Sequence, residues 1–158
     1  MLNTEVNYGI LRAAVLALVL AAPVTLAQES GDSIEDFEAN SFELFIGATL
    51  HDGESDASYG ASYERRVGKA FGIGGLVEYT NGREWVFAVP FTWHITEPWK
   101  VLVAPGFEHE EGESFYLTRV GTAYEFKFTG WSLVPEVNVD FVDGEVKTIL
   151  GVSVGWEF

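Results

Sequence analysis

The sequence lacks cysteine altogether and has few basic residues. Without cysteine no disulfide can stabilise a small secreted domain, so its stability must come from elsewhere, and a closed β-barrel in a bilayer is one solution. Nine Lys and Arg residues stand against 24 Asp and Glu residues, which gives a formal net charge of −15. A surface this acidic argues against nucleic acid as a partner.

The chain also lacks an amino-terminal apolar run long enough to cross a membrane. Residues 13–22 are apolar, but this stretch is too short for a transmembrane helix and Pro23 interrupts it. Arg12 precedes the run, and a small-residue site ending at Ala27 follows it, which is typical of a secretory signal peptide. We therefore predict a signal peptide over residues 1–27.

The remainder of the chain is long enough for one domain. Residues 28–41, QESGDSIEDFEANS, are polar, acidic and aperiodic, which predicts a flexible periplasmic leader. Residues 42–158 are then expected to form a single β-barrel domain. Aromatic residues make up 15% of the chain and there are 17 glycines, a combination that favours β-structure with tight turns.

Alternation of apolar and small or charged residues is the main pattern present. It is clear in the last stretch, EVKTILGVSVGWEF, where every second residue from Val146 to Phe158 is apolar or nearly so. Asn81-Gly82 is the strongest hairpin signal. The pattern predicts eight strands in an up-and-down meander, at residues 42–50, 58–66, 70–80, 84–95, 99–108, 115–126, 131–142 and 145–158. Three prolines lie inside these strands, at positions 90, 105 and 135, and predict local bulges.

The volume of the side chains indicates which face points outward. The apolar face carries most of the Trp, Tyr and Phe residues, too much volume for the inside of eight strands, whereas the opposite face is dominated by Gly, Ala and Ser with isolated charges. The apolar face is therefore expected to contact lipid. Trp85 and Trp93 are separated by roughly 20 Å of height in a tilted strand, as in the two aromatic girdles of a membrane barrel.

The carboxyl end resembles the closing strand of bacterial outer-membrane β-barrels, in which a terminal aromatic residue such as Phe158 is read by the barrel-assembly machinery. Residues 42–158 resemble the small eight-stranded family that includes the OmpA transmembrane domain and OmpX-type barrels. The resemblance implies an all-β, eight-stranded antiparallel transmembrane barrel. It further implies a monomer, integral to a Gram-negative outer membrane and in contact with membrane lipid and lipopolysaccharide.

The inward-facing positions predict a network of lumen charges. Nine acids and four bases fall on this face, and charges in a narrow lumen must be paired or hydrated. We expect Arg119 to pair with Glu78 and Glu136, and Lys147 with Asp140. The candidate network comprises Glu64, Glu78, Glu84, Lys100, Arg119, Glu136, Asp140 and Lys147. The alternative is a narrow cation-preferring pore, because acids outnumber bases.

No catalytic, cofactor or metal site is predicted. His51 and His109 lie in acidic links that are expected to be a solvated rim, since their spacing matches no metal motif. His94 is expected in the lumen, bonded to a Glu or to backbone. A lipid-modifying enzyme is the second alternative, but no histidine precedes a serine in the pattern that the deacylase type of barrel uses.

Overall fold

The computed structural model describes residues 39–81 and 84–158, and these form an all-β structure. Within them no helix is long and apolar enough to cross a bilayer. The described residues contain ten strands: β1 (Asn40–His51), β2 (Glu54–Arg66), β3 (Phe71–Thr80), β4 (Glu84–Ala88), β5 (Phe91–His94), β6 (Trp99–Glu110), β7 (Glu113–Tyr124), β8 (Phe126–Phe128), β9 (Trp131–Val142) and β10 (Glu145–Glu157).

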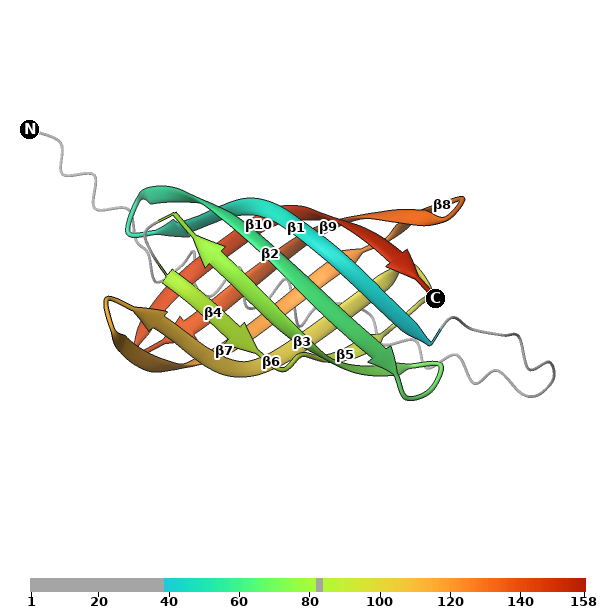
Figure 1. Cartoon of the computed structure of the whole chain (residues 1–158), viewed down its shortest axis with the longest axis horizontal. Coiled ribbons are helices and arrows are strands. Elements are labelled where there is room, and N and C mark those ends of the chain that lie inside the picture. Colours follow the sequence, from blue (N-terminus) through green and yellow to red (C-terminus); the bar gives the residue numbers. More distant parts are fainter. Residues whose placement is uncertain (1–38, 82–83) are drawn as a thin grey trace, which may run out of the picture. The chain divides into compact units, whose positions relative to one another are not determined.

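The strands close into an antiparallel barrel, as the sequence predicts. The strands follow the order β1-β2-β3-β4-β6-β7-β9-β10, with β5 also between β3 and β6 and β8 also on β9, and β10 pairs with both β9 and β1 (Figure 1). The closure extends to the carboxyl end, where the Asn40 amide donates to the Phe158 carbonyl at 3.0 Å and the Phe158 amide donates back at 2.9 Å. The barrel wall therefore has no free edge along this seam.

Ten strands make eight wall positions because two wall strands are interrupted. β4 and β5 are one wall strand broken at Val89 and Pro90, since both pair with β3 on one side and β6 on the other. β7 and β8 are likewise one wall strand broken at Glu125, and both pair with β9. The eight-stranded fold class predicted from the alternation is confirmed.

The bulges predicted at the three prolines are absent from the described strands. The register runs unbroken past each proline, for example from Ala88↔Gly106 in β4 to Phe91↔Val103 in β5, and Pro135 pairs in step with Val152. The carbonyls of Pro90 and Pro105 still accept ladder bonds, from Gly74 and Val89. Each proline therefore lacks one backbone N–H donor and loses one ladder hydrogen bond, but no extra residue is inserted into the strand. The expectation of bulges was wrong.

Strand boundaries shift slightly from the prediction. The first strand begins at Asn40, so the last residues assigned to the leader belong to the barrel. The predicted signal peptide, most of the leader and Gly82 of the predicted hairpin turn lie outside the described residues. Other turns are clear: Asp52-Gly53, Glu111-Gly112 and Asp143-Gly144 all have positive φ at both positions, the geometry of two-residue type I′ hairpins.

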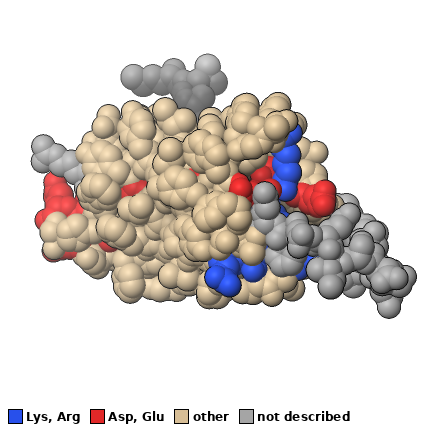
Figure 2. All heavy atoms as spheres, turned by 45° about the vertical axis from the view of Figure 1, so that its right-hand side comes forward, with Lys and Arg blue, Asp and Glu red and all other residues tan. Residues whose placement is uncertain are grey.

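The two faces of the wall have opposite polarity. Large apolar side chains point outward, with exposed fractions of 52% for Phe87 and 58% for Phe107. In the face shown in Figure 2, uncharged atoms cover the middle of the wall, while acidic atoms lie at one end and acidic and basic atoms at the other. The inside holds buried charged groups, including Glu78, Arg119 and Asp140. This is the polarity expected of a barrel that contacts lipid, inverted from that of a soluble barrel.

Aromatic rings gather at both ends of the outer face. Trp85 packs against Tyr79 near the β3–β4 link, with ring centroids 4.9 Å apart. At the end that carries the carboxyl terminus, the stacked pairs are Phe42–Trp156, Phe71–Trp93 and Phe128–Trp131. The two groups have the placement of interfacial aromatic girdles.

The ring of Phe45, which faces inward, shows how narrow the lumen is. The ring of Phe45 lies over Gly47 and Gly151, which are register partners in β1 and β10. A Cβ atom at Gly151 would overlap this ring and the Ile46 carbonyl, whereas a Cβ at Gly75, also in a strand, would meet nothing within 4 Å. Glycine at position 151 therefore provides the space for Phe45.

We expect Gly151→Ala to lower the free energy of unfolding by about 1–3 kcal/mol, because the added methyl overpacks the lumen. Gly75→Ala is the matched control and should change stability far less. Urea unfolding of the folded barrel in detergent, followed by gel mobility, measures both. Equal effects of the two substitutions would contradict the packing argument. If it holds, Gly151→Ala should cost less stability in a Phe45→Ala background than in the unmodified protein.

Candidate functional site

Arg119 on β7 lies at the centre of the lumen charge network. Its guanidinium is 1% exposed and binds two carboxylates. Nε and Nη2 donate to the two oxygens of Asp140, both at 2.7 Å, and Nη1 donates to Oε2 of Glu78 at 2.6 Å. Asp140 is the register partner of Arg119 on β9, whereas Glu78 on β3 reaches it from across the barrel. A bidentate fork of this kind satisfies both the charge and the donors of a buried guanidinium.

Two of the predicted pairings differ in the structure. Glu136 does not bind Arg119 but accepts hydrogen bonds from Asn138 at 2.8 Å and Ser153 at 2.6 Å. Lys147 is the register partner of Asp140, yet its ammonium contacts other acids. The reason is that both oxygens of Asp140 are taken by the Arg119 fork, which is the stronger partner of a carboxylate.

Lys147 instead spans the lumen towards β4 and β6. Its Nζ donates to Oε1 of Glu108 at 2.9 Å and lies at the same distance, 2.9 Å, from Oε2 of Glu84. Lys147 is 4% exposed and Glu108 is 2% exposed. The long, flexible Lys stem makes this crossing possible. Together Glu78, Glu84, Glu108, Arg119, Asp140 and Lys147 form a continuous group of charges across the lumen, which we call the lumen plug.

A second cluster lies towards the carboxyl terminus. Lys100 donates to Glu43, and Nε2 of His94 donates to Glu64 at 2.7 Å. Arg66 lies between Nδ1 of His94 and Glu157, both at 3.4 Å. Because Arg66 can only donate, His94 accepts at Nδ1 and carries its proton at Nε2. The predicted lumen position of His94, bonded to a Glu, is confirmed, but Glu64 and Lys100 belong to this cluster and not to the plug.

Between the two clusters the lumen contains a small cavity of about 50 Å³. Its lining includes Lys100, Arg119 and Glu136. A polar cavity of this size holds a few water molecules. Such water can hydrate the charges on either side, but the lumen plug separates the cavity from the far end of the barrel.

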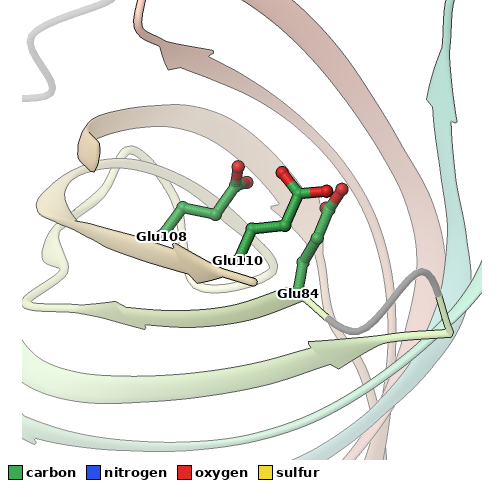
Figure 3. Close-up of side chains that lie close together, drawn as sticks. All are labelled: Glu84, Glu108 and Glu110. Atoms are coloured by element: carbon green, nitrogen blue, oxygen red, sulfur yellow. The ribbon is translucent and has the colours of Figure 1, made fainter. Parts of the chain in front are cut away.

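Three carboxylates converge beside the plug at the end opposite the carboxyl terminus. Glu84, Glu108 and Glu110 each offer an oxygen within 4.8 Å of the others, and Figure 3 shows their side chains extending side by side from two neighbouring strands. Glu110 was predicted to lie in a loop and was therefore not among the candidate lumen residues. The alternation of β6 could have identified it, because the inward-facing residues of this strand are even-numbered and the pattern continues from Glu108 to Glu110.

The predicted rim residues do not form one group. Nε2 of His51 lies 3.2 Å from Glu145 and 3.6 Å from Asp52. Nδ1 of His109 shares a hydrogen bond of 3.0 Å with the hydroxyl of Ser114, a contact between strands that the sequence search for neighbouring His and Ser did not find. Among the described residues no carboxylate contacts the other nitrogen of His109, so the third member of a triad is missing from this exposed pair.

Comparisons with known proteins agree with the fold. No protein-family model matches the chain, and no curated protein matches it in sequence. The amino-terminal β-barrel domain of Pseudomonas aeruginosa OprF superposes with a TM-score of 0.57 at 11% identity, over 75% of this chain and 97% of that one. Ail, the attachment invasion locus protein of Yersinia pestis, gives a TM-score of 0.51 at 13% identity, over 75% and 96%.

A de novo designed transmembrane β-barrel is also similar, with a TM-score of 0.52 at 11% identity over 73% of this chain and 94% of that one. The chain thus spans nearly all of each of these small barrels. Identities this low establish the fold alone. The fold is that of the small OmpA- and OmpX-like barrels to which the sequence shows a resemblance.

We expect Arg119→Met to lower the free energy of unfolding by about 3–5 kcal/mol, because it leaves Glu78 and Asp140 buried without a partner. Arg119→Lys retains the charge but not the bidentate fork and should lose less. The exposed Arg65 provides the control, since Arg65→Met removes the same charge from the outer face. Urea unfolding in detergent measures the series, and a loss for Arg65→Met as large as that for Arg119→Met would contradict the role of the plug.

Proposed function

We propose that this protein is an integral outer-membrane barrel whose lumen is closed by the lumen plug and whose role is structural or in surface interactions. The observation that carries the proposal is the inverted polarity of the wall. Large apolar side chains such as Phe87 and Phe107 face outward, whereas Arg119 and its two carboxylates are buried inside. In water this arrangement would expose a continuous apolar surface, whereas in lipid that surface is solvated and the wall strands satisfy one another's backbone groups.

The plug supports a closed barrel over the pore alternative. Arg119 reaches β9 and β3, and Lys147 reaches β4 and β6, so ion pairs cross the lumen in several directions. Leu117, Val86 and Val142 form a buried apolar cluster beside them. A conducting path needs these partners to separate, which exposes several buried charges together.

The tight turns favour a structural role over an adhesive one. Asp52-Gly53, Glu111-Gly112 and Asp143-Gly144 connect strands with only two residues each, at the end opposite the carboxyl terminus. If the carboxyl terminus faces the periplasm, as the resemblance of the last strand implies, these turns face the cell exterior. They offer a narrow acidic rim and little surface for a large partner.

Cells of a Gram-negative host that express the full chain should carry it in the outer-membrane fraction. Unheated samples should migrate differently from heated ones on a denaturing gel, because a closed barrel resists the detergent. A chain that stays soluble and monomeric without detergent would overturn the proposal. The mass of lipid A should be unchanged in these cells, and a shift in that mass would favour the lipid-modifying alternative.

The full chain, purified from those membranes, should be electrically silent in a planar bilayer. Silence has meaning only for folded protein, so the heat-sensitive gel shift of the same sample is the control. Discrete cation-selective steps would contradict the closed lumen. Steps that change with Glu136→Gln or Arg119→Lys would assign the lumen charges to a conduction path.

A further inference from the structure

The three carboxylates at the end opposite the carboxyl terminus are placed unfavourably unless something neutralises them. The register that pairs Trp85 with His109 sets Glu84 directly across from Glu110 on β4 and β6, and Glu108 lies two residues along the same face. Like charges opposite one another on a sheet destabilise it. Lys147 contacts Glu84 and Glu108, but among the described residues no ion pair involves Glu110.

One oxygen of this cluster is buried without a hydrogen-bond partner. Oε1 of Glu108 accepts from Lys147, whereas Oε2 has no partner in the described structure, although the side chain is only 3% exposed. An unpaired carboxylate oxygen at this depth costs free energy comparable to a lost charged hydrogen bond. It lies on the carboxylate that sits beside those of Glu84 and Glu110 in Figure 3.

The charge balance of the plug leads in the same direction. Arg119 and Lys147 are its two cations. With Glu110 included, five carboxylates contact or adjoin them, and they are Glu78, Asp140, Glu84, Glu108 and Glu110. Buried charge of one sign in such excess is stable only with further cations or with uptake of protons.

We propose that Glu84, Glu108 and Glu110 form a binding site for a divalent cation, Ca²⁺ in preference to Mg²⁺. The donors are all carboxylate oxygens, with no nitrogen or sulfur, which suits a hard cation. Ligand atoms within 4.8 Å of one another fit around an ion with bonds of about 2.4 Å, since opposite ligands are then separated by twice that length. Ca²⁺ tolerates such flexible, unequal ligands better than Mg²⁺, which demands near-ideal octahedral geometry.

The bound cation completes the plug. It supplies the partner that Oε2 of Glu108 lacks, and it joins β4 to the β6–β7 hairpin through side chains where Glu84 and Glu110 would otherwise repel. Lys147 remains on the other oxygen of Glu108, so the site has one buried ligand and two half-buried ones. The site depends on the folded barrel and not on which membrane contains it.

Calcium binding is measured by titration calorimetry on the full chain in detergent, after treatment with EDTA and removal of the chelator. The unmodified protein should bind one Ca²⁺ saturably and more tightly than Mg²⁺, and Ca²⁺ should raise its unfolding midpoint by mass action. Glu108→Gln and Glu110→Gln should each weaken Ca²⁺ binding at least about tenfold, because each removes a charged ligand. Glu110 is half-buried, so Glu110→Gln should still fold if Glu108→Gln does not.

Glu111→Gln is the matched control. It removes the same charge one residue further along, at the exposed turn and outside the cluster. It should bind Ca²⁺ like the unmodified protein. Equal weakening by Glu110→Gln and Glu111→Gln would show that the acidic rim attracts cations diffusely, and would overturn the site. Absence of saturable Ca²⁺ binding by folded, heat-modifiable protein would overturn it as well, without bearing on the localisation or the closed lumen.

Discussion

Closure of the sheet is the constraint from which the other features follow. Once β10 pairs with β1, every wall strand has two neighbours and the lumen has the width that eight strands allow. Little room then remains inside for large rings, and the ring of Phe45 fits where Gly47 and Gly151 leave space for it. The remaining aromatic volume must face outward. An apolar exterior and a small, polar interior are therefore consequences of strand number.

A polar interior of this width in turn determines how charges pair. A guanidinium that lies 1% exposed needs both charge and hydrogen-bond partners, and Asp140 and Glu78 provide them on two sides of the lumen. Because Arg119 binds both oxygens of Asp140, the register partner of Lys147, the ammonium of Lys147 extends to Glu84 and Glu108 instead. One strong bidentate contact thus sets the arrangement of the whole plug.

Much of the fold is readable from alternation alone, because inward and outward residues alternate without a register shift in the described strands. Because of this regularity, the alternation alone predicts that Arg119 and Lys147 face the lumen. It does not predict which carboxylates they bind, since that depends on how far each side chain reaches across the barrel. The prediction of bulges at the prolines was wrong because a strand can lose one backbone N–H donor without gaining an extra residue. Glu110 was missed because a run of acids resembles a loop.

The distribution of charge along the barrel is uneven, and this bears on what the acidic excess is for. Towards the carboxyl terminus, Glu43 and Glu64 each have a basic partner, and Glu157 has two, Arg66 and Lys127. Beyond Arg119 the balance changes, and carboxylates outnumber the single ammonium of Lys147. A cation-conducting path would need an unbroken line of acidic groups, but the buried guanidinium of Arg119, held by Glu78 and Asp140, interrupts that line. Such a distribution is better suited to holding a cation at one place than to passing cations through.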